Sequence, residues 1–477
     1  MMPKHNWIVA HYGRYSPSPI VGISSARAAT PRSVARSPRL FFRPHASEFF
    51  REYCTVCGRM IAILASLSFS VTPLASLSAK TRPASIRPHL PQVDAALKRL
   101  IDDGQFAGFV TVAYKDGKLI HESAQGKRDI ALAAPMTMDS IFRAYSMTKP
   151  VTAVAMMILH EQGKWKPQDP VTKFIPELAD VNVFVGKGTD GTPIFRKPAT
   201  IPTMSQLMNQ TAGFSYGFFN GYVDDKYRAA SLWEATSGDD FVARIAKLPL
   251  AYDPGTKWQY SIAVDLQGVI VERLSGQSLG TFMRRHIFGP LKMHDTAFYV
   301  PMPKQGRLAT VYEWGERALR PAPPSFGMTF KEPPLYHSGG GGLVTTAGDY
   351  ARFARMLLDK GSLEGVRLLR PTSTKMIMTS QLSPEVVNGG FGIGPIQRIR
   401  PGYEYGYDGV VVTDPAAAKV SLGKGSYLWD GAASSWFWVD PTNHSVFVGM
   451  VQRLATDTTP SPQRISQAAF QKALNQR

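Results

Sequence analysis

Beyond residue 90, this 477-residue chain is predicted to begin with a helix followed by a hairpin and to end with a hairpin followed by a helix. After Pro91 the apolar spacing predicts an amphipathic helix that stops at Gly104, and a hairpin turning at Asp116-Gly117 follows it. Near the end, a hairpin that turns over residues 440–444 precedes a closing helix in residues 461–476. This plan suits one antiparallel sheet that both ends of the chain complete.

Between these ends, residues 165–330 show mostly short helical patterns broken by Pro and Gly, with a small hairpin at Asp190-Gly191. No internal repeat and no linker divides this part of the chain. The sequence therefore predicts an α+β fold, in which helices flank an antiparallel sheet and a mainly helical region is inserted. The closing helix is expected to bury one face, which is formed by Ile465, Ala468, Ala469 and Ala473.

Residues 1–79 differ in composition from the rest and are expected to lie outside the fold. They hold nine Lys or Arg against two Glu, a net charge of +7, and are rich in Arg, Ser and Pro up to about residue 50. An apolar run, 61–69, and small residues near position 78 then follow a basic residue, as in a secretory signal peptide. We expect the true start of the protein near residue 56 or 60 and cleavage of the signal peptide near Lys80. The folded domain is then expected to comprise residues 80–477. Export to the periplasm or outside the cell is the favoured location, and an organellar transit peptide is the alternative.

The net charge of +18 does not point to nucleic acid, because the chain after residue 79 has no dense Lys/Arg run and no base-stacking motif. The apolar run of the leader is too short for a stable membrane span. Both cysteines, Cys54 and Cys57, lie in the leader, and a lone CxxC forms neither a redox site nor a metal cage. The sequence contains no signal for the oligomeric state.

A serine and a lysine three residues apart, Ser146 and Lys149, open a predicted helix that runs to Gly163. Residues with this spacing share a helix face, so the lysine can reach the hydroxyl. A lysine can act as a base only if burial lowers its pKa, and the apolar run VTAVAMMIL supplies a suitable wall. The alternative is a serine that caps the helix and a solvated lysine.

Two other serines compete for the role of nucleophile. Ser421 and Lys424 repeat the Ser-x-x-Lys spacing, but in a glycine-rich stretch without fixed geometry. Ser215 lies in Gly-Phe-Ser-Tyr-Gly, which fits the nucleophile elbow of α/β-hydrolases. That elbow needs a strand before the serine and a helix after it, whereas here a helical pattern precedes and a loop follows. We therefore predict a turn at Ser215 and take Ser146 as the nucleophile.

Five blocks follow one another from about residue 90 to the end of the chain. They are FRAYSMTKPVTAVAMMILHEQG, LMNQTAGFSYG, PGTKWQYSIAVDLQGVIVERLSGQSL, HSGGGGLVTTAGDYARFARMLLDKG and YLWDGAASSWFWVDP. In this order they resemble the serine β-lactamase and penicillin-recognising superfamily, and in particular its class C-like branch, which includes the family VIII carboxylesterases. The resemblance implies a β-lactamase/transpeptidase-like fold.

The resemblance implies a role for Tyr260, which occupies the family's conserved tyrosine position in the third block, and assigns an oxyanion hole to the backbone N–H groups of Ser146 and Ala432. Trp429, Asp430 and Gly431 would line the substrate. In lactamases this last block begins Lys-Thr-Gly, and Trp429 removes the ammonium that pairs with a substrate carboxylate. Ile262 likewise stands where lactamases commonly carry Asn.

The mechanism implied is double displacement through an acyl-enzyme on Ser146, with Lys149 and Tyr260 moving protons. The favoured function is a carboxylesterase acting on small esters. The alternatives are a weak β-lactamase, a D-amino-acid amidase or peptidase, transesterification, and a penicillin-binding sensor that acylates without turnover. This chemistry needs a small-molecule ester or amide and no metal or organic cofactor, and no His pair has HExxH spacing.

Overall fold

The computed structural model describes residues 88–325, 328–389, 401–456 and 459–476. The predicted leader, its cleavage site and both cysteines lie outside the described residues and stay predictions. The helices are α1 Pro91–Asp102, α2 Thr148–Glu161, α3 Met204–Met208, α4 Tyr222–Ala229, α5 Gly238–Ile245, α6 Ala263–Ser275, α7 Leu279–Met283, α8 Ala347–Leu358, α9 Pro371–Ile377, α10 Pro384–Gly389, α11 Pro415–Ala418 and α12 Pro462–Leu474. Within these residues, no helix combines the length and the apolar character needed to cross a bilayer.

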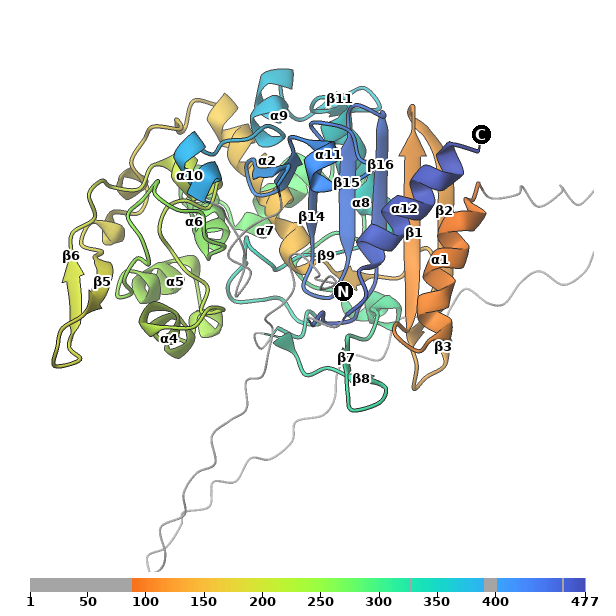
Figure 1. The fold of residues 1–477 in the computed structure, drawn as a ribbon, viewed down its shortest axis with the longest axis horizontal. Coiled ribbons are helices and arrows are strands. Elements are labelled where there is room, and N and C mark those ends of the chain that lie inside the picture. The colour runs from red at the N-terminus through yellow and green to blue at the C-terminus, as the bar shows by residue number, and fades with distance from the viewer. Residues whose placement is uncertain (1–87, 326–327, 390–400, 457–458, 477) are drawn as a thin grey trace, which may run out of the picture. The chain divides into compact units, whose positions relative to one another are not determined.

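One antiparallel sheet of eight strands has the order β12-β13-β14-β15-β16-β1-β2-β3. Its strands are β1 Gly108–Lys115, β2 Lys118–Asp129, β3 Ala134–Pro135, β12 Tyr403–Tyr405, β13 Val410–Val412, β14 Tyr427–Asp430, β15 Trp436–Asp440 and β16 Ser445–Met450. The first and last hairpins join where β1 pairs with β16, with Val110 opposite Met450 and Lys115 opposite Ser445. The predicted sheet, completed by both ends of the chain, is confirmed (Figure 1).

The two predicted hairpin turns follow from local residue chemistry. Asp116 and Gly117 both have positive φ, 50° and 74°, as a two-residue type I′ turn requires. In the second turn, the Asp440 side chain accepts a hydrogen bond from the Asn443 backbone N–H, at 2.9 Å, and another from the Asn443 side-chain amide, at 2.7 Å. These turns fix the register of the strands that lie beside the site.

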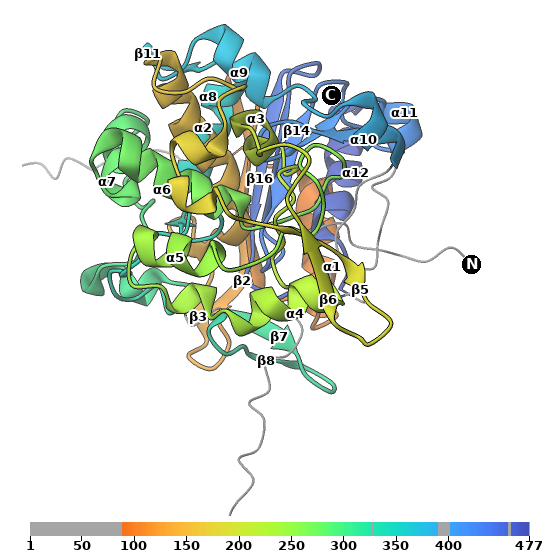
Figure 2. The same ribbon diagram turned by 90° about the vertical axis from the view of Figure 1, so that its left-hand side faces the viewer.

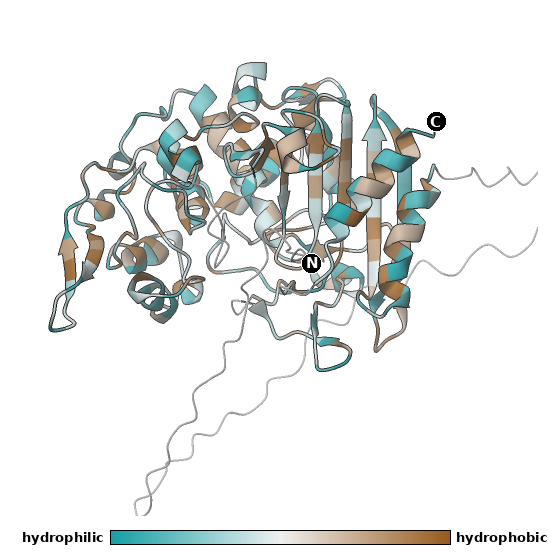
Figure 3. Ribbon diagram, viewed as in Figure 1, coloured by the Kyte–Doolittle hydropathy of each residue, from teal (hydrophilic) through white to brown (hydrophobic). Residues whose placement is uncertain are grey.

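Helices cover both faces of the sheet, α1 and α12 on one and α8 on the other (Figures 1 and 2). In Figure 3 the turns of α1 and α12 alternate between hydrophobic and hydrophilic residues, as expected of amphipathic helices. The buried face of α12 differs from the prediction, because Ala468 is exposed and Ile465 only half-buried. Phe470 packs edge-on to Trp438 and Phe447, at 5.8 and 5.7 Å between ring centroids, and this large side chain decides which face turns inward.

The region inserted between the ends carries short helices, as predicted, and also small two-stranded sheets. β5 Val183–Lys187 and β6 Pro193–Arg196 form the hairpin expected at Asp190-Gly191. β7 Tyr312–Trp314 and β8 Leu319–Pro321 form a further hairpin that the sequence did not predict. The remaining pairs are β4 Phe142–Arg143 with β9 Val344–Thr345, and β10 Ser362–Leu363 with β11 Val366–Arg367. The β4–β9 pair joins the segment before Ser146 to the glycine-rich block.

Candidate active site

Ser146 lies in a short 3₁₀ turn, Tyr145–Met147, that leads directly into α2. The sequence predicted the helix to include Ser146, and the turn keeps Ser146 and Lys149 on the same side. Lys149 Nζ lies 3.4 Å from Ser146 Oγ, and both side chains are buried. The alternative of a solvated lysine is therefore wrong.

Tyr260 reaches the same point from the loop before α6, 114 residues further along the chain. Its hydroxyl donates a hydrogen bond of 2.6 Å to Ser146 Oγ. Its ring packs between aromatic neighbours, with centroids 5.1 Å from Tyr216 and 5.6 Å from Trp429. The structure thus brings together the three side chains to which the sequence analysis assigned proton transfer and nucleophilic attack.

The environment of Lys149 favours its neutral form. Burial lowers the pKa of Lys149 to about 8, although the carboxyl groups of Asp265 and Asp408 act in the opposite direction. Nζ donates to the Gly340 carbonyl oxygen at 2.6 Å and to the Tyr216 hydroxyl at 3.3 Å. A neutral amine has two N–H bonds and one lone pair, so these two acceptors leave the lone pair for the Ser146 hydroxyl.

Asp265, on α6, is a member of this cluster to which the sequence analysis gave no role. Its carboxylate accepts hydrogen bonds from Ser338 Oγ at 2.6 Å, the Gly340 backbone N–H at 3.1 Å and the Tyr216 hydroxyl at 3.3 Å. Burial raises the pKa of Asp265, whereas Lys149 and these donors lower it. One signal could have found it: Asp265 is the one charged residue in the largely apolar run SIAVDLQGVIV.

The glycine-rich block, Gly339–Gly342, gives the backbone room to approach the cluster. A Cβ on Gly340 would lie 2.5 Å from Asp265 Oδ2 and 2.9 Å from the Tyr216 hydroxyl, and one on Gly339 would lie 2.5 Å from the Val264 carbonyl oxygen. The backbone of this block therefore lies in direct contact with the cluster. His337, just before this block, packs edge-on to Phe298 at 4.7 Å between ring centroids.

The backbone amides expected to form the oxyanion hole lie on two segments that meet. A Cβ on Gly431 would lie 2.5 Å from the Ala144 carbonyl oxygen, so the segment carrying Ala432 passes close to the residues before Ser146. Among the described residues, the N–H groups of Ser146 and Ala432 form no hydrogen bond. Their role in stabilising an oxyanion stays a prediction.

A small cleft opens at Ser146, with a volume of about 10 Å³. Its walls are formed by Tyr145, Ser146, Tyr216, Trp233, Met328, Ser338, Gly340 and Gly341. Trp429, expected to line the substrate, is fully buried behind Tyr260, with its ring also 5.4 Å from that of Tyr405. Asp430 is buried as well, and burial raises the pKa of its carboxyl group well above the usual value.

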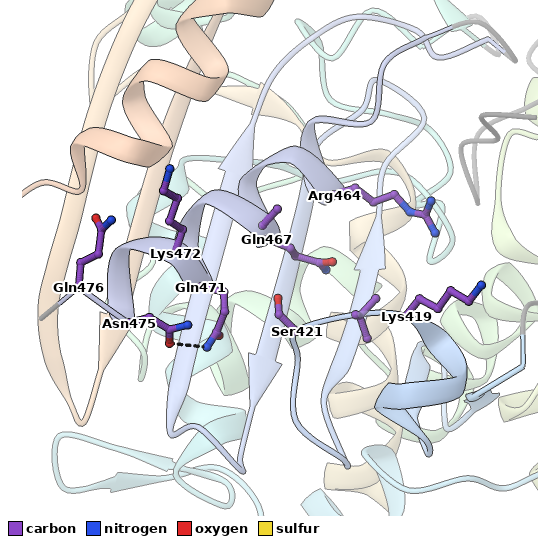
Figure 4. A pocket seen from close by; sticks show the side chains of 10 residues that line it. Lys419, Ser421, Arg464, Gln467, Gln471, Lys472, Asn475 and Gln476 are labelled. Atoms are coloured by element: carbon purple, nitrogen blue, oxygen red, sulfur yellow. Dashed lines mark hydrogen bonds between the residues drawn. The ribbon is translucent and has the colours of Figure 1, made fainter. Parts of the chain in front are cut away.

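Neither competing serine has comparable partners. Ser215 is fully buried, donates to Asp224 Oδ1 at 2.8 Å and accepts from the Gln259 side chain at 2.7 Å. It follows α3 in an irregular loop, so among the described residues around it the strand and helix of a nucleophile elbow are absent, and the backbone at Ser215 is not the predicted turn. Ser421 is exposed in a surface pocket of about 630 Å³ that Gln467 and Gln471 of α12 also line (Figure 4). In the described part of the chain, no hydrogen bond joins Ser421 to Lys424.

The described residues contain no group of three or more His, Cys, Asp or Glu side chains placed to hold a metal ion. The side chains gathered around Ser146 Oγ are a buried amine, a phenol and, one step further away, a carboxylate. This combination suits nucleophilic attack on an acyl group followed by proton transfer.

Comparisons with known proteins agree with this chemistry. The sequence model of the family described as Beta-lactamase matches residues 93–470. Protein Rv1367c of Mycobacterium tuberculosis is 35% identical over 75% of this chain and 88% of its own length. Esterase EstB of Burkholderia gladioli is 29% identical over 72% of this chain and 86% of its own. The unliganded structure of simvastatin synthase, LovD, from Aspergillus terreus superposes with a TM-score of 0.69 at 21% identity and covers 81% of this chain and 98% of that one.

Proposed function

The chain belongs to the beta-lactamase family and is a serine hydrolase, and we propose that it is a carboxylesterase that cleaves small esters through an acyl-enzyme on Ser146. One observation carries this proposal. Ser146 Oγ lies 2.6 Å from the Tyr260 hydroxyl and 3.4 Å from Lys149 Nζ. These side chains are buried, and burial lowers the pKa of Lys149 to about 8. A hydroxyl placed between a donor and an amine whose pKa is lowered toward neutral pH is an activated nucleophile.

In the first step, Ser146 Oγ attacks the ester carbonyl carbon and its proton passes to Lys149 Nζ. The carbonyl oxygen becomes an oxyanion, which the N–H groups of Ser146 and Ala432 stabilise by hydrogen bonding. When the bond to the leaving oxygen breaks, that oxygen takes a proton from Lys149, directly or through the Tyr260 hydroxyl. An alcohol leaves, and the acyl group stays on Ser146.

In the second step, water attacks the acyl carbon and gives its proton to Lys149. The bond between that carbon and Ser146 Oγ then breaks, and Oγ regains a proton from the Lys149–Tyr260 pair. A carboxylic acid leaves and the resting state returns. Asp265 touches neither reacting atom, and it acts as a positioning residue because it holds Tyr216 and Gly340, the two groups that accept hydrogen bonds from Lys149.

Preference for esters over β-lactams is supported by Trp429. In the lactamases, a lysine at this position supplies a cation for the carboxylate of the substrate. Trp429 instead packs its ring against Tyr260, 5.6 Å away. An uncharged ester does not need that cation, whereas a penicillin loses a charge-assisted hydrogen bond.

Turnover of a short-chain nitrophenyl ester tests this function. We expect sustained release of nitrophenol from 4-nitrophenyl acetate, loss of that release in Ser146→Ala, and retention in Ser421→Ala, the exposed serine of the second Ser-x-x-Lys. Benzylpenicillin should be hydrolysed far more slowly than the ester. A single burst without a steady rate would instead favour a sensor, and faster turnover of the penicillin would reverse the preference.

A further inference from the structure

The cleft at Ser146 is very small. Its volume of about 10 Å³ gives room for about one water molecule. During catalysis the acyl carbon is bonded to Ser146 Oγ, so the acyl chain has to occupy the space beside this atom. The side chains that close the cleft therefore limit the length of that chain.

One wall is Tyr145, the residue directly before the nucleophile. Its backbone has φ of 45°, in the left-handed region that a bulky aromatic residue rarely adopts and that costs about 1–2 kcal/mol. The side chain is buried, and its ring packs edge-on to Phe330 with 5.9 Å between centroids. The guanidinium of Arg143 lies over the ring of Phe330, 5.6 Å from its centroid. Tyr145 is therefore held in place at the cleft.

Another part of the lining, formed by Tyr216 and Trp233, belongs to a stack of aromatic rings. Tyr216 stacks on Phe218 at 4.4 Å and on Trp233 at 5.8 Å between centroids, and Trp233 packs on Phe241 at 6.2 Å. A stacked set of this kind resists displacement, because moving one ring disturbs its neighbours. The hydrogen bonds of the Tyr216 hydroxyl with Lys149 and Asp265 tie this wall to the catalytic cluster.

We propose that Tyr145 is a specificity-determining residue that restricts the substrates of this enzyme to esters of very short acyl groups, acetate above all. The inference rests on the proposed function and adds the substrate class. The phenol ring of Tyr145 fills the space into which the second and later methylene groups of an acyl chain would extend. Met328 also lines the cleft, and its flexible side chain can yield to a small acyl group.

The experiment measures kcat/KM for 4-nitrophenyl acetate, butyrate and octanoate, and compares ratios within each variant. In the wild type we expect the value to fall with chain length. Tyr145→Gly removes the ring and suits the positive φ, so the ratio of butyrate to acetate should rise by about 10-fold or more. Tyr145→Phe keeps the ring and should keep the wild-type ratio.

Tyr145→Ala repeats the test without added backbone freedom, because Ala meets about the same left-handed cost as Tyr. The ratio should rise in this variant too, even if both absolute rates fall. Ratios within twofold of the wild type in both variants would overturn the assignment of Tyr145, and so would a wild type that prefers octanoate. A wild type that hydrolyses none of the three esters would instead contradict the proposed carboxylesterase function.

Discussion

Replacing Lys149 with methionine is expected to lower kcat/KM for 4-nitrophenyl acetate by about 10³-fold or more. The only amine within reach of Ser146 Oγ among the described residues is lost, and positioned proton transfer contributes about 10²–10⁴-fold to catalysis. Methionine has a similar length and no charge, so the buried slot stays filled. The measurement is steady-state hydrolysis by each purified variant. Lys424→Met, at the exposed lysine of the second Ser-x-x-Lys, is the matched control and should match the wild type.

The pH profile gives this prediction a second readout. The pKa of Lys149 is lowered from its ordinary value to about 8, so about half of the amine is neutral near pH 8 and nearly all of it is neutral well above pH 9. The kcat/KM of the wild type should therefore rise tenfold for each pH unit below about pH 7 and level off above about pH 8–9. In Lys149→Met the residual kcat/KM should not show this rise with pH. A wild-type profile that is flat from pH 6 to 9 would contradict the role of Lys149 as the base.

Replacing Asp265 with alanine is expected to destabilise the fold by about 3 kcal/mol or more, because each buried donor that loses its acceptor costs about 1–3 kcal/mol. Three donors, Ser338 Oγ, the Gly340 N–H and the Tyr216 hydroxyl, lose their acceptor, and Lys149 loses its nearby buried carboxylate. The measurement is urea unfolding followed by circular dichroism. Asp265→Asn keeps an acceptor oxygen and should lie between alanine and the wild type.

The control for this prediction is Asp180→Ala. The Asp180 side chain is 99% exposed and, among the residues that the structure describes, pairs with the exposed Lys197 at 3.2 Å, so its loss should leave the unfolding midpoint unchanged. If Asp265→Ala unfolded at the same urea concentration as Asp180→Ala, the buried carboxylate network would have no part in stability. Asp265 would then also lose its assigned role of positioning Tyr216 and Gly340.

Several elements could be predicted because short-range signals determine them. The spacing of apolar residues predicted α1. The pair Asp116-Gly117 predicted the first hairpin, because these residue types tolerate the positive φ angles that its turn requires. The same-face position of Ser146 and Lys149 follows from helix geometry alone. Tyr260 is different: no local pattern connects it with Ser146 across 114 residues, and only the resemblance of its block to a known family placed it in the site.

The rest of the site depends on long-range packing that the sequence does not display. Tyr216 belongs to a segment that was predicted only as a turn, yet its hydroxyl links Lys149 to Asp265. The left-handed backbone of Tyr145 runs against the preference of aromatic residues and is held by contacts with Phe330. In α12, the periodicity of apolar residues predicted that Ala468 would be buried. Ala468 is exposed instead, because Phe470 packs against Trp438 of the sheet and sets which face of the helix is buried.

The central claim is that Ser146 Oγ carries the acyl group and that Lys149 takes its proton. The most direct measurement is acid quenching within the first turnover of 4-nitrophenyl acetate, followed by digestion and mass analysis of the peptides. We expect one acetyl group on the peptide containing Ser146 in the wild type and none at the same time point in Lys149→Met. An acetyl group on a peptide without Ser146, or equal acetylation of Ser146 in both proteins, would contradict the account.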